Sequence, residues 1–309
     1  MVAVIVSWNS AFHLETAIRS VPSGVKVVVV DNGSADGSAA AARKAGADVI
    51  ENGRNRGFGI ACNQAVAALP GVPSFLFLNP DAALVDGAES LALLAAELEG
   101  DPSLAAVAPR LSGDGQEEFQ LRKLPTIGSF AREAFLLNRL WPKNPWFRRE
   151  RYLDRPRTEP FDVEQPAAAA LMIRREAFEA VGGFDAAFSP AWFEDVDLAA
   201  KLWKSGRRIR YLPAARATHA GGATMKAMPY RDFLPLYTRN ACRYVARHHS
   251  APMRLAIRVV LLAGALLRLG LLPLVRGDHE RGDAAIAYLR VVRGLSGFGW
   301  RSALLSGGA

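Results

Sequence analysis

The sequence contains few cysteines, and their scarcity argues against two kinds of small protein. Only Cys62 and Cys242 occur among its 309 residues. Two isolated cysteines give neither a disulfide framework nor the closely spaced pairs of a zinc site. We therefore expect a protein of the reducing cytoplasm. A chain of this length that is 50% hydrophobic and 22% charged can bury a sizeable core.

The sequence also lacks a long uncharged apolar run. A membrane-spanning helix needs about 18 or more such residues, and the best candidate, 253–275, is interrupted by Arg254, Arg258 and Arg268. The start, MVAVIVSWNS, has no basic residue before its short apolar run. This pattern favours a buried strand over a signal peptide.

Acidic residues are scarce in the C-terminal third of the chain. Residues 201–309 contain 19 Lys+Arg against 4 Asp+Glu, whereas residues 1–118 contain 7 against 14 and residues 119–200 contain 12 against 12. The net charge of +8 therefore comes from one end of the chain. Such a region favours an anionic partner, either membrane lipid or a phosphorylated substrate. Nucleic acid is the least favoured partner, because the sequence has no interleaved aromatic and basic platform.

Short apolar runs alternate with helix-forming stretches in the N-terminal half. The runs that predict strands are Val2–Trp8, Val25–Val30, Ala47–Ile50 and Ser74–Leu78, and the stretches that predict helices are Leu14–Val21, Ser38–Ala45 and Ile60–Leu69. This order predicts an α/β fold with a mostly parallel central sheet and helices on both faces. In such sheets, ligands bind beyond the carboxyl ends of the strands.

Polar clusters follow these predicted strands. The clusters are Ser7-Trp8-Asn9, Asp31-Asn32-Gly33-Ser34, the glycine-rich loop 52–59 with Arg54 and Arg56, and Asn79-Pro80-Asp81. Backbone in a glycine-rich loop can approach an anion closely, so Arg54 or Arg56 could meet a diphosphate. Asp31 could hydrogen-bond a base or ribose, or it could belong to an ordinary turn that caps the next helix.

Three acids in four positions, Glu194, Asp195 and Asp197, stand before a basic amphipathic segment. The spacing of Leu198 and Leu202 predicts a helix that begins at the acids. A helix start stabilises carboxylates, so Glu194 and Asp197 can be simple caps. A functional role is favoured for Asp195, because catalytic groups concentrate on loops held by a rigid scaffold.

Five motifs in this order resemble those of family 2 glycosyltransferases of GT-A fold, within them the rhamnosyltransferase-like branch. They are VAVIVSWNS, VVVVDNGSADGS, NRGFGIACNQAV, FLFLNPDAAL and the segment that runs from ALMIRREAF to THAGGAT. The resemblance implies a GT-A catalytic domain over residues 1–225, with a donor half at about 1–112 and an acceptor half at about 113–225. A basic helical region at 226–309 follows, with membrane-interface or subunit-contact helices.

The resemblance also implies roles for single residues. The nucleotide-sugar donor would meet Ser7, Asn9, Asp31, Asn32, Arg56, Gly57, Asn79 and Asp81. Asp81 would bind a divalent Mg or Mn ion, and His219 would complete the metal site unless it is a structural histidine. Asp195 would be the general base and Glu194 would orient the acceptor, while Asp197 would cap the helix.

The chemistry of sugar transfer fits these roles. Departure of a nucleoside diphosphate leaves negative charge that a hard cation stabilises. A placed carboxylate can take the proton of the attacking hydroxyl, and attack opposite the leaving group inverts the anomeric centre. Asn79-Pro80-Asp81 offers one carboxylate where many relatives have two, so substrate phosphates would support the metal.

The expected function is therefore an inverting transferase that moves a sugar, best described as rhamnose, from a dTDP- or UDP-linked donor. The acceptor would be a glycan or polyprenyl-linked glycan of cell-envelope polysaccharide synthesis, at the inner face of the plasma membrane. The alternatives are a sugar nucleotidyltransferase and a non-catalytic protein that binds a sugar nucleotide or glycan. A nucleotidyltransferase would need a glycine-rich loop where Ser7-Trp8-Asn9-Ser10 stands.

Two further segments give less specific signals. Residues 119–165 hold many prolines and little periodicity, which predicts a long irregular segment beside the acceptor site. Its Trp141, Trp146 and Phe147 could pack on an acceptor or simply anchor the segment.

Residues 253–275 predict an apolar helix. Arg254, Arg258, Arg268 and Arg276 fall within roughly 80° of one another on it. The helix could lie in a membrane interface with its arginines on anionic headgroups, or pack on the catalytic domain or on a second subunit of a homodimer. Pro273 would kink it, and residues 283–295 extend the basic character.

Overall fold

The computed structural model describes residues 1–113, 119–221, 228–274 and 277–297. The chain divides into two compact units. The first unit comprises residues 1–124 and 151–224, and the second comprises residues 125–150 and 225–309. The first unit is an α/β domain and the second is built of helices, so we call the second the helical unit.

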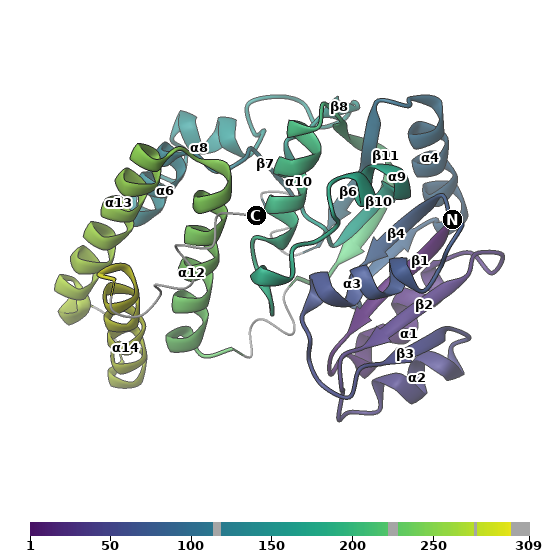
Figure 1. Ribbon diagram of the computed structural model, residues 1–309, viewed down its shortest axis with the longest axis horizontal. Helices are drawn as coiled ribbons and strands as arrows, with labels where there is room; N and C mark the ends of the chain where they lie inside the picture. Colours follow the sequence, from purple (N-terminus) through teal and green to yellow (C-terminus); the bar gives the residue numbers. More distant parts are fainter. Residues whose placement is uncertain (114–118, 222–227, 275–276, 298–309) are drawn as a thin grey trace. The chain divides into compact units, whose positions relative to one another are not determined.

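A mixed sheet forms the centre of the first unit (Figure 1). Among the described residues it has nine strands in the order β3-β2-β1-β4-β10-β6-β11-β5, with β8 paired to β11. The strands are β1 (Val2–Ser7), β2 (Val27–Asp31), β3 (Asp48–Glu51), β4 (Ser74–Leu78), β5 (Ala82–Val85), β6 (Leu104–Ser112), β8 (Phe161–Asp162), β10 (Ala170–Arg174) and β11 (Arg208–His219). Strands β1 to β4 are parallel, as the sequence predicts, and β5, β8 and β10 run antiparallel to their neighbours.

Both faces of the sheet are buried because successive side chains of a strand point to opposite sides. In β1, Val2, Val4 and Val6 join one hydrophobic cluster, and Ala3 and Ile5 join the other. The same alternation in β2 and β4 explains why their sequences read as continuous apolar runs. A sheet covered on both sides leaves only its strand ends open to a ligand.

Helices cover the two faces in separate groups. One group packs on the cluster that contains Val4 and the other on the cluster that contains Ile5. The first group is α3 (Phe58–Ala67), α9 (Arg175–Ala180) and α10 (Glu194–Lys204), and the second is α1 (Ala11–Ser20), α2 (Ser38–Lys44) and α4 (Gly87–Gly100). The predicted helices at 14–21, 38–45 and 60–69 are thereby confirmed with small shifts of their ends.

The prediction of a long irregular segment over 119–165 is wrong in its middle part. Residues 127–150 form three short helices, α6 (Ile127–Ala134), α7 (Leu137–Leu140) and α8 (Pro145–Glu150). Helix α6 begins with a capping box in which Thr126 and Ser129 exchange side-chain and backbone hydrogen bonds. On either side, β7 (Leu121–Arg122) and β9 (Gln165–Pro166) pair as a small antiparallel sheet.

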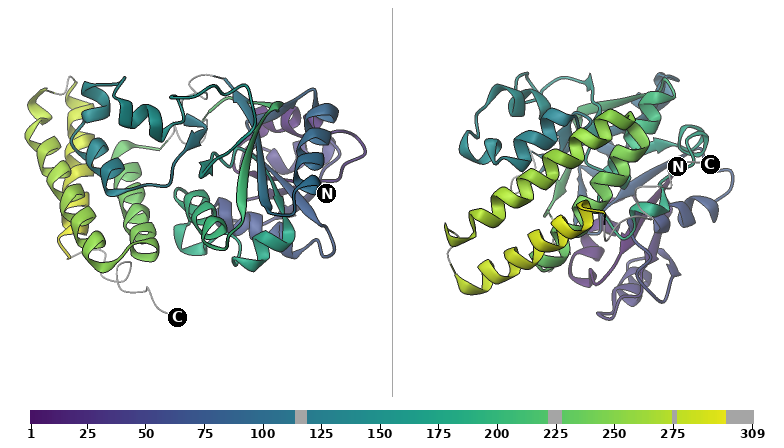
Figure 2. Two further views of the ribbon diagram at one scale, coloured as in Figure 1. Left: turned by 90° about the horizontal axis from the view of Figure 1, so that it is seen from above. Right: turned by 60° about the vertical axis from the view of Figure 1, so that its left-hand side comes forward.

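Three longer helices complete the helical unit (Figure 2). They are α12 (Tyr230–His248), α13 (Ala251–Gly270) and α14 (Asp278–Leu295), and they run alongside one another around Cys242, Ala265, Val291 and Leu295. Helix α13 ends at Gly270, before Pro273, and a short 3-10 turn (Leu272–Leu274) follows. Within the described residues, no helix is both long enough and apolar enough to cross a bilayer.

Candidate active site

The carboxyl end of β2 delivers Asp31 into a tight turn. Asp31 Oδ2 accepts hydrogen bonds from the backbone N–H groups of Gly33 (3.1 Å) and Ser34 (3.0 Å). One half of the carboxylate therefore builds the turn that the sequence allowed as an alternative. The other oxygen, Oδ1, is buried and has no hydrogen-bond partner within the described part of the chain, so its capacity to accept a hydrogen bond is unused.

Neighbouring strand β1 brings Ser7 and Asn9 to the same turn. Asn9 adopts a left-handed backbone with φ of 50°, and its Oδ1 accepts from the N–H of Ala35 at 2.8 Å. The N–H of Asn32 donates to the carbonyl of Ser7 at 2.8 Å. Ser7 is fully buried, and its hydroxyl has no hydrogen-bond partner among the described residues. Four predicted donor residues thus lie together at the ends of two paired strands.

The loop 52–57 closes over this turn. Asn32 Oδ1 accepts from Asn52 Nδ2 at 2.9 Å, and Asn32 Nδ2 donates to the carbonyl of Gly57 at 3.4 Å. A Cβ on Gly33 would lie 2.7 Å from the backbone nitrogen of Arg54, so only glycine permits this approach. Arg54 and Arg56 are exposed.

Gly57 links the loop to the segment that precedes the acidic helix. Its φ is 89°, and a Cβ there would lie 2.7 Å from Ser189 Oγ and 2.8 Å from the carbonyl of Pro190. The Ser189 hydroxyl donates to the carbonyl of Arg56 at 2.8 Å, and the Phe58 N–H donates to that of Pro190 at 3.3 Å. The loop therefore packs by its main chain against the approach to α10.

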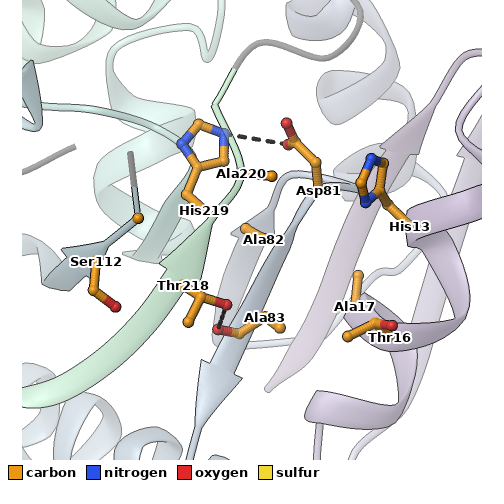
Figure 3. A pocket seen from close by; sticks show the side chains of 11 residues that line it. His13, Thr16, Ala17, Asp81, Ala82, Ala83, Ser112, Thr218, His219 and Ala220 are labelled. Atoms are coloured by element: carbon orange, nitrogen blue, oxygen red, sulfur yellow. Dashed lines mark hydrogen bonds and ion pairs between the residues drawn. The ribbon is translucent and has the colours of Figure 1, made fainter. Parts of the chain in front are cut away.

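A second group of predicted residues meets where β4 and β11 end (Figure 3). Strand β11 pairs with β5 so that His219 lies opposite Ala82, directly after Asp81. The imidazole Nε2 of His219 lies 3.2 Å from Asp81 Oδ1 and 3.3 Å from Asn79 Nδ2. The side chains of Asp81 and His219 are 10% and 12% exposed, so this pair is accessible but largely enclosed.

The Asp81 and His219 pair borders a cavity of about 260 Å³. His13 of α1 also lines this cavity (Figure 3), although no sequence motif singles it out. Among the described residues, no three His, Cys, Asp or Glu side chains cluster as a complete metal site. One carboxylate oxygen and one imidazole nitrogen nevertheless suit a partial ligand set, to which donor phosphates and water would add oxygens.

The acid cluster begins α10, where the sequence places it. Asp195 Oδ1 accepts from the N–H of Val196 at 2.8 Å, and Asp195 Oδ2 accepts from Gln165 Nε2 at 2.9 Å. Burial raises the pKa of Asp195, while the nearby charge of Arg122 and these two hydrogen bonds oppose the rise.

Its neighbour Glu194 differs in protonation. Burial, together with the charge of Asp195, raises the pKa of Glu194 to about 8. The Oε2 atom of Glu194 is buried with no hydrogen-bond partner among the described residues. Two adjacent buried carboxylates resist double ionisation, and the hydrogen bonds from Gln165 and the Val196 N–H favour the ionised form of Asp195 over that of Glu194.

Asp197 does not serve as the helix cap that the sequence suggests. The backbone of Phe193 occupies the N-cap position, and the Asp197 side chain is fully buried with its Oδ2 3.0 Å from Lys201 Nζ. Lys201 also donates to the carbonyl of Gly183 at 2.7 Å. This ion pair ties the first turns of α10 to the loop before it.

Sequence analysis missed two residues of the β7–β9 sheet that act on Asp195. Strands β7 and β9 pair Arg122 with Gln165, and both act on the Asp195 carboxyl. Gln165 is 1% exposed. A glutamine 30 positions from the acid carries no local signal, and only the fold brings the two together.

Solved structures with a similar fold define the class. The chain superposes on the mannosyltransferase PcManGT of Pyrobaculum calidifontis, solved with GDP-Man and Mn²⁺, with a TM-score of 0.56 at 17% identity, covering 97% of this chain and 87% of that one. It also matches glucosyl-3-phosphoglycerate synthase of Mycobacterium tuberculosis, solved with Mn²⁺, UDP and glucosyl-3-phosphoglycerate. The TM-score is 0.53 at 16% identity, and the match covers 80% of this chain and 78% of that one. The first unit therefore has the GT-A glycosyltransferase fold that the motifs imply.

The sequence places the chain in a family within that class. The family model "Glycosyl transferase family 2" matches residues 2–182. The chain is 30% identical over 284 residues to N-acetylglucosaminyl-diphospho-decaprenol L-rhamnosyltransferase of M. tuberculosis, which covers 86% of this chain and 90% of that protein. The protein belongs to glycosyltransferase family 2, as its motifs predict.

Proposed function

We propose that this glycosyltransferase moves a sugar, with inversion, from a nucleoside-diphosphate donor to a glycan or polyprenyl-linked acceptor. The observation that carries the proposal is the acid pair at the start of α10, where Gln165 and the Val196 N–H hold the Asp195 carboxylate. A carboxylate kept ionised beside a protonated neighbour suits a general base. It would take the proton of the acceptor hydroxyl as that oxygen attacks the sugar.

The donor would lie over the carboxyl ends of β1, β2 and β4. The unpartnered Asp31 Oδ1 and the Ser7 hydroxyl suit the base and ribose of a nucleotide, with Asn9 and Asn32 beside them. The exposed Arg56 and the close-approach backbone of Gly57 suit the diphosphate, and Asn79 would face the sugar-phosphate end.

Asp81 and His219 would hold a divalent Mg or Mn ion between them. When bound, such an ion stabilises the charge that develops on a departing diphosphate. The 3.2 Å between Asp81 Oδ1 and His219 Nε2 supports this assignment. The enclosed position of the pair supports it too, because electrostatic interactions are stronger away from bulk water.

The donor sugar and acceptor follow from similarity. The relative that shares 30% of residues is, by its name, a rhamnosyltransferase that acts on N-acetylglucosaminyl-diphospho-decaprenol. We accordingly propose a rhamnose donor, dTDP- or UDP-linked, and a polyprenyl-diphosphate acceptor in the synthesis of a cell-envelope polysaccharide. The enzyme would then work in the cytoplasm at the inner face of the plasma membrane.

The test is the substitution Asp195→Asn, with Asp48→Asn as a matched control on the exposed side of β3. Transfer from dTDP-rhamnose to polyprenyl-diphospho-N-acetylglucosamine should fall about 100- to 10,000-fold in Asp195→Asn and stay unchanged in Asp48→Asn. The thermal shift caused by dTDP with Mn²⁺ should persist in both variants. NMR of the product should show the anomeric configuration opposite to that of the donor.

Other outcomes select other functions. If Asp195→Asn transfers sugar at the parental rate, the base assignment is wrong. If the parental chain binds donors but neither transfers nor hydrolyses them, it is a sugar-nucleotide-binding protein. If it instead joins a sugar phosphate to a nucleoside triphosphate, it is a nucleotidyltransferase.

A further inference from the structure

The outer face of α13 carries a stripe of exposed apolar side chains. Leu255, Val259 and Leu266 are 64%, 57% and 51% exposed. At 100° per residue they lie within roughly 40° of one another. The nearby α14 adds Ile286 and Leu289, which are 40% and 58% exposed. A run of large apolar side chains on one face of a water-facing helix marks an interaction site.

Two arginines border this stripe on one side. Arg254 and Arg258 lie roughly 60° to 100° around the helix from Leu255. Each uses its Nε on a main-chain carbonyl, Arg254 on His249 at 2.8 Å and Arg258 on Leu295 at 2.5 Å. These bonds hold both guanidinium groups in place and, within the described residues, leave their terminal N–H groups for another acceptor.

No carboxylate in the described part of the chain pairs with Arg254 or Arg258, whereas other arginines of the helical unit have acidic partners. Arg268 is one of these. It bonds to the carbonyl of Glu133 and lies 3.4 Å from the Glu133 carboxylate. The expectation that Arg268 meets anionic headgroups together with Arg254 and Arg258 is therefore wrong, and Arg276 lies outside the described residues.

A cavity of about 240 Å³ lies between the two arginines and α12. Its other lining residues are apolar and include Cys242, Val245 and Ile257. Burial raises the pKa of Cys242 to about 12, so this side chain is a neutral thiol at physiological pH. Cationic groups at the mouth of an apolar cavity suit a ligand with a phosphate joined to a hydrocarbon chain.

The charge of the helical unit restricts the occupant of this face. Residues 125–150 and 225–309 contain 18 Lys+Arg against 6 Asp+Glu. A second copy that docked by the same face would bring arginines against arginines. A bilayer with anionic headgroups offers both an acyl layer for the leucines and phosphates for the arginines.

We propose that the α13 face of the helical unit docks the protein on an anionic phospholipid bilayer. Leu255, Val259 and Leu266 enter the headgroup and acyl boundary, and Arg254 and Arg258 hold lipid phosphates at the mouth of the cavity. The proposal rests on the membrane-bound acceptor of the proposed function and names the surface that reaches it.

Vesicle flotation of the full chain tests this docking. Vesicles of equal parts phosphatidylglycerol and phosphatidylcholine should bind the protein at least about tenfold better than pure phosphatidylcholine vesicles, and added salt should weaken the binding. The triple variant Leu255→Ser, Val259→Ser, Leu266→Ser and the double variant Arg254→Gln, Arg258→Gln should each lose about tenfold or more. Because Arg258 also holds the carbonyl of Leu295, Arg254→Gln alone serves as the milder variant.

Controls separate docking from folding and from catalysis. Phe12→Ser removes an apolar side chain that is 90% exposed in the first unit, and Arg19→Gln with Arg43→Gln removes two charges there; both should bind vesicles as the parent does. Asp195→Asn should also bind normally, and the α13 variants should keep the parental rate of donor hydrolysis in detergent. Failure of the proposed function would thus leave flotation intact.

Three results would overturn the docking proposal. Equal binding to both vesicle types would contradict the contacts between the arginines and lipid phosphates, and no loss in the α13 variants would remove the surface from any role in membrane binding. A change from dimer to monomer in the triple variant, measured by light scattering without vesicles, would instead identify the face as a contact between copies.

Discussion

The two units of this protein differ in how they use charge. In the first unit, with 20 Lys+Arg against 24 Asp+Glu, acids stand at strand and helix ends, where backbone N–H groups and amide side chains hold them. The helical unit has an excess of cations and exposes large apolar side chains along α13. Balanced charge, with polar atoms such as Asp31 Oδ1 that lack a hydrogen-bond partner among the described residues, suits chemistry on a small charged substrate. An excess of positive charge beside an apolar surface suits attachment to an anionic bilayer.

Loss of the proposed metal ligand should have the largest effect, because it should lower the rate of sugar transfer without changing membrane binding. Asp81→Asn removes the carboxylate that lies beside His219, and the transfer rate measured with Mn²⁺ should fall about 100-fold or more. A chelator should lower the parental rate to a similar level. Flotation with anionic vesicles should not change. A parental rate that resists chelators would contradict the assignment of Asp81 and His219.

A change at Gly57 should damage the first unit through its backbone. Gly57→Ala places a Cβ against Ser189 and Pro190 at a φ of 89°, and we expect a loss of about 1–3 kcal/mol in the free energy of unfolding. Gly46→Ala is the matched control, because Gly46 has a φ of 93° but open space around its Cβ position. Denaturant unfolding of both variants separates the clash from the backbone strain. Equal losses would show that the contact with Pro190 is unimportant.

Removal of the Gln165 amide should move the pH profile of transfer. The hydrogen bond from Gln165 lowers the pKa of Asp195, so Gln165→Leu should raise it. The acid limb of the rate profile should then shift to higher pH by about one unit. Gln64→Leu is a control, since Gln64 Oε1 has no hydrogen-bond partner in the described residues. A lower rate with an unmoved acid limb would mean that Gln165 acts only through packing.

Glu194 gives the smallest expected effect, on stability. Its pKa rises from the ordinary 4.5 to about 8 in the folded protein, so the folded state favours the protonated form. Stability should therefore be lost as the pH rises from about 4.5 to about 8. Glu194→Gln mimics the protonated form and should remove this loss, so that the variant is the less pH-dependent of the two between pH 6 and 8. Thermal unfolding at several pH values measures it, and parallel slopes for parent and variant would contradict the raised pKa.

The elements that bury alternating or helical apolar faces could be predicted from sequence. Strand β4 has the bounds that its apolar run predicts, and α10 begins at Glu194 as its acids indicate. The short helices α6 to α8 could not be predicted, because prolines and charged residues obscure their apolar periodicity. The first of them, α6, depends on a capping box at its start. The roles of Gln165 and Arg268 depend on partners far along the chain, Asp195 and Glu133. Apolar periodicity predicts which face of a helix is buried, but it does not predict which residues pack against that face.

The contact between Gly57 and the Ser189-Pro190 segment limits how this enzyme can be redesigned. The loop would face the donor, and the segment precedes the acid pair. They are far apart in the sequence, yet they pack closely and share a hydrogen bond. A chimera that exchanges only residues 1–112 with a relative would pair a foreign loop with the original partner segment. An exchange of sugar specificity should therefore transplant residues 52–59 and 184–190 as one piece.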